Sequence, residues 1–278
     1  MIVGVVGSGT MGRGIALAFA QTDGYEVCFC SRKEETAREG KEKIRKTLKK
    51  RVERKKITAE NAEKILNRIK TGTNEICAPA DIVVECVRED METKKKLFKE
   101  LENICSEKCI FASNTSALSI TEMGRGLKHP VVGMHFFNPA DVMLLVEVVP
   151  GMEASDNVTK QVKEIAESIG KVPVCVAESP GYVVNRILIP MINEGILLYA
   201  EGISSPEEID IAMKRGANHP MGPLELGDLI GLDVVLAIME TLMEETGDPK
   251  YRPHPILKKM VRAGKLGRKS GSGFYQYG

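Results

Sequence analysis

The chain has almost no net charge and no long uninterrupted apolar run. Its 39 lysines and arginines nearly balance 38 aspartates and glutamates, which leaves a formal net charge of +1 and no global attraction to nucleic acid or an acidic membrane. A membrane-spanning helix needs about 20 apolar residues, whereas polar side chains interrupt the most apolar stretch, residues 182–200. No basic segment precedes the first apolar run, Ile2–Val6, so export is not indicated. We expect a soluble, cytoplasmic protein with no nucleic-acid or membrane partner.

Paired cysteines are missing as well. The seven cysteines include two close pairs, Cys28 with Cys30 and Cys105 with Cys109, and neither pair has the Cys-x-x-Cys spacing of zinc sites. Cys28 and Cys30 alternate along an apolar segment, as small buried side chains of a strand do. We therefore expect no metal, and unpaired cysteines fit a reducing compartment.

The length of 278 residues and a hydrophobic content of 43% are typical of a globular chain with two domains. The first part alternates strand-like apolar segments with helical segments, which predicts a parallel sheet covered by helices. The expected strands are residues 2–6, 26–30, 82–85, 109–112, 131–135, 144–149 and 172–176, and the expected helices are residues 11–21, 33–54, 60–70, 93–104 and 157–169.

Strand patterns end near the Pro180-Gly181 pair. Helical patterns dominate beyond it, and Pro206 and Pro223 each open a helix whose first turn is acidic. We expect a sheet-containing domain at residues 1–181 and an all-helical domain at residues 182–278. The helix expected at residues 182–200 is apolar around most of its circumference, which suits a central core helix, a subunit interface, or both. A small helical domain covers such a helix poorly by itself, so we expect a homodimer formed through this domain.

A glycine-rich turn joins the first strand to the first helix. Gly7, Gly9 and Gly12 form a Gly-x-Gly-x-x-Gly pattern, with Thr10 and Met11 opening the helix. In this position the glycines permit a tight turn, a close approach of the backbone to a pyrophosphate, and packing of the helix on the strand. A plain glycine-rich turn is the alternative. The pattern predicts an α/β fold in which an N-terminal Rossmann-type doubly wound sheet binds a dinucleotide and an all-α C-terminal domain follows.

The second strand ends without the acidic residue that usually binds the adenosine ribose of NAD. Ser31, Arg32 and Lys33 stand there instead. A hydroxyl followed by two cations suits a 2′-phosphate, which an acid would repel. We therefore expect NADP(H) to be favoured over NAD(H). Alternatively, Arg32 and Lys33 are solvated turn residues and NAD(H) binds adequately.

One histidine stands apart from the other three, which all precede proline. His135 ends a predicted strand, at the sheet edge where open α/β sheets bind their ligands. A hairpin centred near Asp141 would place Glu147 directly opposite His135. A carboxylate that fixes the tautomer of an imidazole and stabilises its charged form suits general acid–base chemistry on an alcohol. A purely structural His–Glu pair is the alternative.

Several longer motifs stand along the chain: Ser113-Asn114-Thr115-Ser116, His135-Phe136-Phe137-Asn138-Pro139 with Glu147 after it, Pro180-Gly181-Tyr182-Val183-Val184-Asn185-Arg186, Gly216-Ala217-Asn218-His219-Pro220-Met221-Gly222-Pro223-Leu224, and Gly267-Arg268-Lys269-Ser270-Gly271. These motifs resemble those of the 3-hydroxyacyl-CoA dehydrogenases, and the resemblance covers essentially the whole chain. The last two motifs look especially like those of the members that act on 3-hydroxybutyryl-CoA in butyrate-forming bacteria.

This resemblance implies the interconversion of acetoacetyl-CoA and (S)-3-hydroxybutyryl-CoA. It assigns His135 as the general acid and base and Glu147 as the residue that orients it. The positions implied to hold the substrate oxygens are Ser116, Asn138 and Asn185, and those implied to lie near the cofactor are Glu89, Lys94, Ser116 and Lys269. The chief departure from the family pattern is Ser31-Arg32 in place of the acid.

Residues 41–56 contain ten lysines or arginines and only two glutamates. An apolar stripe at spacing four makes a solvated amphipathic helix the plain interpretation. The resemblance places CoA recognition in this region, and Lys50 and Arg54 are the candidates for its phosphates. The run lacks interleaved aromatic residues, so nucleic acid is not expected. Two rival functions remain: a β-hydroxyacid dehydrogenase acting on free acids with a catalytic lysine, and a non-catalytic dinucleotide-binding protein.

Overall fold

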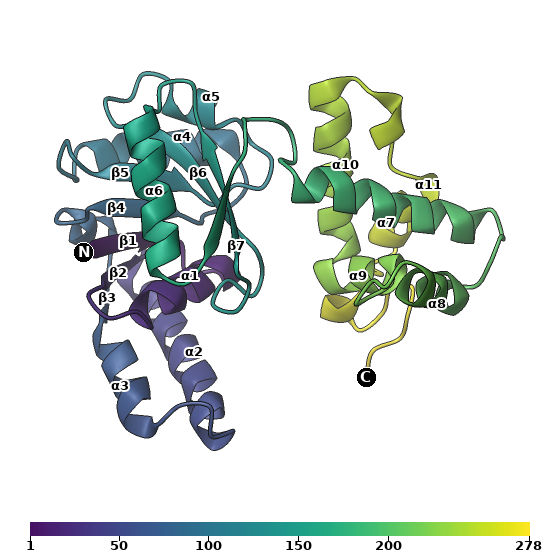
Figure 1. Cartoon of the computed structure of the whole chain (residues 1–278), viewed down its shortest axis with the longest axis horizontal. Coiled ribbons are helices and arrows are strands. Elements are labelled where there is room, and N and C mark those ends of the chain that lie inside the picture. Colours follow the sequence, from purple (N-terminus) through teal and green to yellow (C-terminus); the bar gives the residue numbers. More distant parts are fainter. The chain divides into compact units, whose positions relative to one another are not determined.

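The computed structural model describes all 278 residues, which form two compact units, Met1–Glu178 and Ser179–Gly278. The division falls three residues before the end of the first domain expected from the sequence. The first unit contains every strand of the sheet, and the second contains helices only, as the sequence predicts (Figure 1). Each unit is described below by itself.

The first unit is built around an eight-stranded sheet with the order β3-β2-β1-β4-β5-β6-β7-β8. All neighbouring strands run parallel except β6 and β7, which pair antiparallel. The strands are β1 (Ile2–Val6), β2 (Glu26–Cys30), β3 (Ile69–Gly72), β4 (Ile82–Glu85), β5 (Ile110–Ser113), β6 (Val131–Phe136), β7 (Leu145–Pro150) and β8 (Val172–Cys175). The chain leaves β1 for β2 on one side and later returns to place β4 on the other, so the strand order reverses between β1 and β4. Open α/β sheets bind their ligands beside such a reversal.

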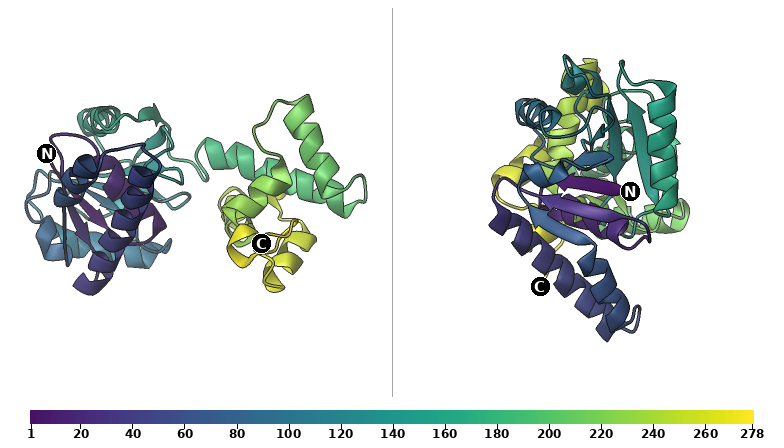
Figure 2. Two further views of the ribbon diagram at one scale, coloured as in Figure 1. Left: turned by 90° about the horizontal axis from the view of Figure 1, so that it is seen from below. Right: turned by 90° about the vertical axis from the view of Figure 1, so that its left-hand side faces the viewer.

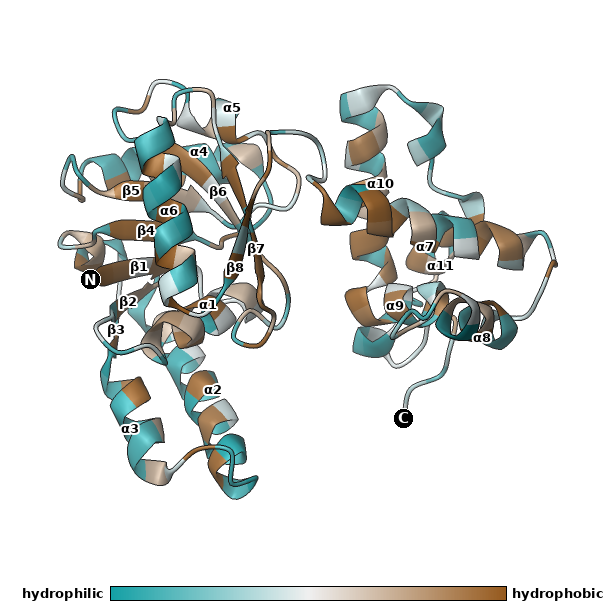
Figure 3. Ribbon diagram, viewed as in Figure 1, coloured by the Kyte–Doolittle hydropathy of each residue, from teal (hydrophilic) through white to brown (hydrophobic).

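Helices cover both faces of this sheet. They are α1 (Thr10–Ala20), α2 (Glu34–Glu53), α3 (Ala59–Asn67), α4 (Met91–Glu102), α5 (Ile120–Gly124) and α6 (Asp156–Ser168), with a short 3-10 turn, η1 (Asn74–Cys77), after β3. Side chains of α1, α2, α3 and α6 share one apolar core with alternate residues of the strands. On the opposite face, Phe98 of α4 stacks on Phe111 of β5 with the ring centroids 5.4 Å apart. The central strands β1, β4, β5 and β6 are buried on both faces, which explains why they are almost continuously apolar (Figure 3).

Helices α2 and α3 lie side by side and extend beyond the sheet (Figure 2). The sequence predicts a helix over residues 60–70, whereas α3 ends at Asn67 and residues Ile69–Gly72 form β3. The predicted helix was wrong at its C-terminal end, because β3 is a short edge strand with two polar residues and shows no clear alternation of apolar and polar side chains. Its pairing with β2, for example Val27 opposite Ile69, depends on a partner more than thirty residues earlier in the chain. Helix α5 was also missed, since its five residues are too few to show a helical period.

The second unit consists of helices around a separate apolar core. Its elements are α7 (Val184–Ala200), α8 (Pro206–Gly216), α9 (Pro223–Ile230), α10 (Leu232–Thr246), η2 (Pro249–Tyr251), α11 (Pro255–Arg262) and η3 (Arg268–Ser270). Pro206 and Pro223 open α8 and α9, as the sequence predicts, and Ser205 caps α8 by accepting a hydrogen bond from the Glu208 N–H. Helix α7 places Ile189, Ile192 and Ile196 in the core. None of the helices in the structure combines the length and apolarity that a bilayer crossing requires.

Two buried carboxylates tie the end of the chain to the second unit. Asp228 of α9 is fully buried and accepts hydrogen bonds from the backbone N–H groups of Phe274 and Tyr275, at 3.0 and 2.9 Å, and from the Tyr277 hydroxyl. Asp210 of α8 accepts bonds from two N–H groups in the first turn of α9 and from the Tyr275 hydroxyl. Neither carboxylate forms a salt bridge, so each depends on these donors to offset its burial.

Replacing Asp228 with alanine is expected to lower the free energy of unfolding by about 3 kcal/mol, because two buried N–H groups lose their acceptor. Urea denaturation followed by circular dichroism measures the change. Asp248→Ala is the matched control, since Asp248 lies half-exposed in the same unit and accepts from the Lys250 N–H. A loss no larger than that of the control would contradict this role for Asp228.

Candidate functional site

The glycine-rich turn has the geometry of a phosphate-binding loop. Gly7 has a φ of 113°, and a Cβ there would lie 2.6 Å from the Cys86 carbonyl oxygen. A Cβ on Gly12 would overlap the Gly7 carbonyl oxygen, so α1 can approach the turn only without a side chain. A Cβ on Gly9 would meet nothing within 4 Å, which leaves space beside the backbone for a ligand. These observations match the three roles that the sequence assigns to the glycines.

The N-terminus of α1 suits an anion. Gly9 is its N-cap and no side chain accepts a hydrogen bond from the first turn, which also contains no acidic residue. The first N–H groups are therefore available, and the helix dipole adds partial positive charge. Arg13 adds a full positive charge beside the turn. Its guanidinium is held there because it donates hydrogen bonds to the Ser8 carbonyl at 3.0 Å and to the Thr10 hydroxyl at 3.3 Å. The residues present fit a dinucleotide pyrophosphate.

Ser31 and Arg32 lie next to this loop. The Gly7 N–H donates to the carbonyl of Cys30, the last residue of β2, at 2.9 Å, so the two strand ends are held together. The Ser31 N–H donates to the Gly72 carbonyl, and the Arg32 side chain is exposed with no hydrogen bond or ion pair. A guanidinium that has no partner within the protein and lies beside a dinucleotide-binding loop can bind an anionic group on the adenosine ribose.

Polar side chains line up on one face of the sheet, at the carboxyl ends of β4, β5 and β6 and beside them on the antiparallel strand β7. Glu85 of β4 pairs with Ser113 of β5, and Ser113 pairs with Gly133 of β6, two residues before His135. Glu147 of β7 completes the row. All of these residues alternate with core residues of the opposite face, and four of them are buried: Glu85, Ser113, His135 and Glu147. A run of buried polar groups at this edge is typical of a ligand site.

His135 and Glu147 are directly opposite each other in the antiparallel pair of β6 and β7, which confirms the predicted register. His135 Nδ1 lies 2.8 Å from Glu147 Oε2, and the exposed fractions of the two residues are only 6% and 1%. A carboxylate at this distance favours the tautomer of the ring that carries its proton on Nδ1. The end of β6 is held in place by Asn114, whose side-chain oxygen accepts from the Phe136 N–H at 2.8 Å.

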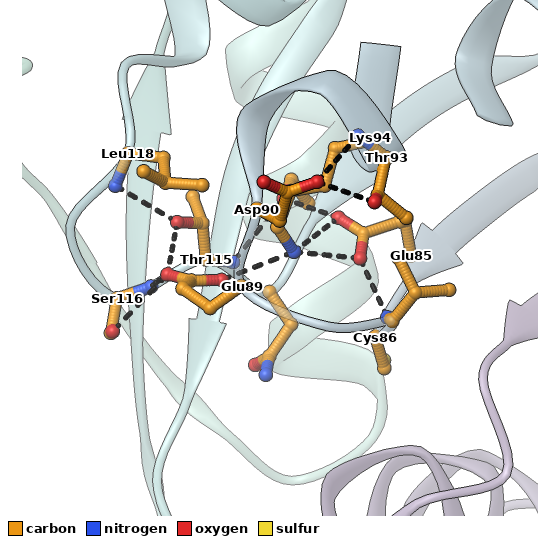
Figure 4. A network of polar contacts seen from close by, with 12 residues as sticks. Glu85, Cys86, Glu89, Asp90, Thr93, Lys94, Thr115, Ser116 and Leu118 are labelled. Carbon is orange, nitrogen blue, oxygen red and sulfur yellow. Dashed lines mark hydrogen bonds and ion pairs between the residues drawn. The ribbon is translucent and has the colours of Figure 1, made fainter. Parts of the chain in front are cut away.

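Glu89, Lys94 and Ser116 belong to one polar network (Figure 4). The Lys94 ammonium is 1% exposed and lies 2.7 Å from Glu85 and 3.1 Å from Glu89. Glu89 in turn accepts from the Thr115 hydroxyl at 2.6 Å and from the Ser116 N–H at 2.8 Å. Burial raises the pKa of Glu89, but Lys94 and these hydrogen bonds outweigh it and hold the pKa below its ordinary value. The structure thus brings three of the expected cofactor residues together.

The remaining candidates lie in three places. Asn138 is exposed after β6 and lines a cleft of about 350 Å³ between α1, α2 and the loop that joins β6 to β7. Helix α2 lines this cleft with Lys43, Thr47 and Arg51, whereas Lys50 and Arg54 are exposed and do not line it. Two candidates belong to the helical unit: Asn185, buried in the first turn of α7, and Lys269, whose ammonium lies 2.6 Å from Asp233 Oδ2.

Four residues with contacts in this site were not singled out from the sequence: Arg13, Glu85, Asn114 and Thr115. Glu85 carried a usable signal, because it is an acid at the end of the apolar segment Ile82–Glu85 that predicts a buried strand. Buried acids at strand ends need a cationic or hydrogen-bonding partner. The roles of Asn114 and Arg13 depend on contacts with backbone groups, which no residue pattern reveals.

Comparison with known proteins supports this description of the chain. Residues 2–179 match the family model for the 3-hydroxyacyl-CoA dehydrogenase NAD binding domain, and residues 181–277 match the model for the C-terminal domain of the same family. The chain is 52% identical to a 3-hydroxybutyryl-CoA dehydrogenase of Clostridioides difficile, over 100% of this chain and 99% of that protein. It is 39% identical to the human mitochondrial hydroxyacyl-coenzyme A dehydrogenase, over 99% of this chain and 90% of that protein.

A solved structure agrees with these matches. The crystal structure of (S)-3-hydroxybutyryl-CoA dehydrogenase from Ralstonia eutropha superposes with a TM-score of 0.93 at 44% identity, covering 100% of this chain and 99% of that one. The two family models together span nearly the whole chain, and these three relatives align over 90% or more of their own length. The chain therefore belongs to the 3-hydroxyacyl-CoA dehydrogenase family, as its motifs and its α/β plus all-α architecture predict.

Proposed function

We propose that this protein interconverts acetoacetyl-CoA and (S)-3-hydroxybutyryl-CoA with a nicotinamide cofactor, using His135 as general acid and base. The observation that carries the proposal is the buried His135–Glu147 pair at the carboxyl edge of a dinucleotide-binding sheet. The names of the relatives from Clostridioides difficile and Ralstonia eutropha support the choice of substrate. A bound nicotinamide would supply the hydride to carbon 3 during reduction and accept it during oxidation.

The protein supplies the proton. During reduction, the charged imidazole of His135 donates from Nε2 to the oxygen at carbon 3 as that atom becomes an alkoxide. During oxidation, the neutral ring accepts the hydroxyl proton at the same nitrogen. Glu147, which lies 2.8 Å from Nδ1, keeps the ring in the required tautomer and stabilises its charged form. The carboxylate is nearly fully buried, so water screens this interaction weakly.

Neutral side chains suit the substrate oxygens. We assign this task to Ser116, Asn138 and Asn185, because hydroxyl and amide donors polarise a carbonyl without competing for the transferred proton. We propose that the CoA phosphates are bound by Lys50 and Arg54, which are both exposed on the cationic helix α2. Lys269 is assigned to the cofactor. Lys94 and Ser116, which both contact Glu89, would support the cofactor from the first turn of α4 and from the loop after β5.

For the cofactor we propose NADP(H) in preference to NAD(H). The family model identifies the first unit as an NAD binding domain and thus supports a nicotinamide dinucleotide of either kind. The preference rests on Ser31 and on the uncommitted, exposed guanidinium of Arg32 beside the glycine loop.

One spectrophotometric assay tests the reaction. Acetoacetyl-CoA and free acetoacetate are each supplied with NADPH or NADH, and oxidation of the cofactor is followed at the absorbance of its reduced form. The proposal predicts turnover with acetoacetyl-CoA only, and faster turnover with NADPH. Preference for the free acid would support the β-hydroxyacid dehydrogenases, and binding of cofactor without turnover would support a non-catalytic protein.

We also propose that the protein is a homodimer formed through its helical unit. Large apolar side chains are exposed on that unit, among them Ile187 at 68%, Ile203 and Ile211. Isolated exposed apolar residues are ordinary, but several on one small helical unit are typical of an interaction surface. Sedimentation equilibrium measures the mass in solution, and a monomer at micromolar concentration would contradict the proposal.

A further inference from the structure

The innermost residue of the polar network is Glu85, which has no part in the proton transfer proposed above. It is the last residue of β4 and is fully buried. Its Oε1 accepts from the Val87 N–H at 2.6 Å and from Lys94 at 2.7 Å, and its Oε2 accepts from Lys94 at 2.9 Å and from the Ser113 hydroxyl at 2.7 Å. Four hydrogen bonds satisfy a carboxylate, so Glu85 is anchored by the loop after β4, by α4 and by the end of β5.

We propose that Glu85 is a positioning residue, which acts through Lys94 and Glu89 to hold Ser116 in place. The inference rests on the proposed function, in which Ser116 contacts substrate and cofactor. The chain of contacts is continuous: Glu85 to Lys94 at 2.7 Å, Lys94 to Glu89 at 3.1 Å, and Glu89 to the Ser116 N–H at 2.8 Å. Figure 4 shows these side chains pointing toward one another from the loop after β4, from α4 and from the loop after β5.

Lys94 cannot occupy its position without Glu85. It lies in the first turn of α4, where the helix dipole disfavours a cation, and its side chain is withdrawn from water. Burial lowers the pKa of Lys94, but the charges of Glu85 and Glu89 outweigh it and raise the pKa above its ordinary value. Glu89 alone is a weak anchor, because its own side chain is 41% exposed and can turn toward solvent. Glu85 therefore determines where the ammonium lies.

The position of the ammonium in turn determines that of Ser116. Glu89 uses one oxygen for Lys94 and the other for the Thr115 hydroxyl, the Ser116 N–H and the Ser116 hydroxyl. The Thr115 hydroxyl also accepts from the Leu118 N–H at 3.0 Å, so residues 115–118 are held around one carboxylate oxygen. If Glu89 turns away, this loop loses its three hydrogen bonds to the carboxylate at once. Reacting groups displaced by about 1 Å can lose most of their catalytic effect.

The test uses a double variant that carries both Glu85→Gln and Lys94→Met, and it compares this variant with the wild-type protein. The pair removes both buried charges together, which avoids an unpaired charge, and the methionine keeps the bulk of the lysine stem. Hydrogen exchange of the backbone amides is measured in the full chain without ligand, together with kcat and KM for acetoacetyl-CoA. We expect exchange at residues 115–118 to become at least tenfold faster and kcat to fall about tenfold, while the melting temperature and exchange in β1 and β2 change little.

Glu100→Gln is the matched control, because Glu100 lies on the same helix and accepts from the Asn74 side chain outside the network. Unchanged exchange at residues 115–118 in the double variant would overturn the proposal. If the double variant does not fold, Glu85→Asp replaces it, since the shorter side chain withdraws the ammonium from Glu89 and must also loosen residues 115–118. The exchange measurement needs no substrate, so it decides the role of Glu85 even if the wild-type protein does not turn over acetoacetyl-CoA, a result that would contradict only the proposed function.

Discussion

Replacing His135 with alanine is expected to lower kcat for acetoacetyl-CoA reduction by about 10²- to 10⁴-fold, the usual contribution of a positioned general acid. The alkoxide that forms at carbon 3 would lose its proton donor, and no other histidine lies at this edge of the sheet. Binding of the dinucleotide is expected to change little, because its loop lies at the ends of β1 and β2, and β4 and β5 separate these strands from β6, which carries the imidazole. Steady-state kinetics and calorimetric titration with the cofactor measure the two effects separately.

Two further variants provide the comparison needed to interpret this loss of kcat. Glu147→Gln keeps a hydrogen-bond acceptor near Nδ1 but removes the charge, so we expect a smaller loss of kcat, about tenfold. His219→Gln is the matched control, since His219 is half-buried in the helical unit and makes no side-chain hydrogen bond. Near-normal turnover of His135→Ala would remove this residue from the mechanism, whatever the other two variants do.

Combining Ser31→Asp with Arg32→Ala is expected to shift the cofactor preference toward NAD(H). The ratio of kcat/KM for NADPH to kcat/KM for NADH should fall about 10- to 100-fold, which corresponds to roughly 1.4 to 2.8 kcal/mol. That is the range expected when one charge-assisted hydrogen bond to the 2′-phosphate is lost and a carboxylate is placed near the phosphate. The new carboxylate would also bind the two ribose hydroxyls of NADH.

The variant is expected to fold normally, because Arg32 is exposed and the backbone bonds of Cys30 and Ser31 do not involve their side chains. Lys33→Ala is the control: it removes a neighbouring cation of equal charge and should change the ratio less than threefold. An unchanged ratio in the double variant would contradict the assignment of Ser31 and Arg32 to the ribose and leave them as solvated turn residues.

Patterns among residues close together in the sequence were sufficient to predict most of the fold. The spacing of Gly7, Gly9 and Gly12 after an apolar strand predicted a phosphate-binding turn, and the structure contains a turn that excludes a side chain at Gly7 and Gly12 and leaves open space beside Gly9. The pairing of His135 with Glu147 was predictable for a different reason. A hairpin connection and the alternation of side chains along strands determine which residues face each other, so counting outward from the centre of the connection was enough.

The polar network around Lys94 could not be predicted in this way. Glu85, Glu89 and Ser116 come from two loops that meet only because β4 and β5 are neighbours in the sheet. Whether Lys94 faces a cofactor or is buried between two carboxylates depends on how α4 packs on that face. The same holds for β3, which is a strand only because β2 offers it a partner.

The order of residues along the chain thus decided the strand–turn–helix that can bind a dinucleotide, the strand pair that carries an imidazole and a carboxylate, and the division into a sheet-containing and a helical part. These depend on short-range geometry, which neighbouring residues determine among themselves. Tertiary packing alone decided which charges are buried and which partners satisfy them, because the desolvation of a charge depends on every element that covers it. The position of Ser116 therefore depends on how the folded sheet brings the ends of β4 and β5 together, and the sequence alone does not predict it.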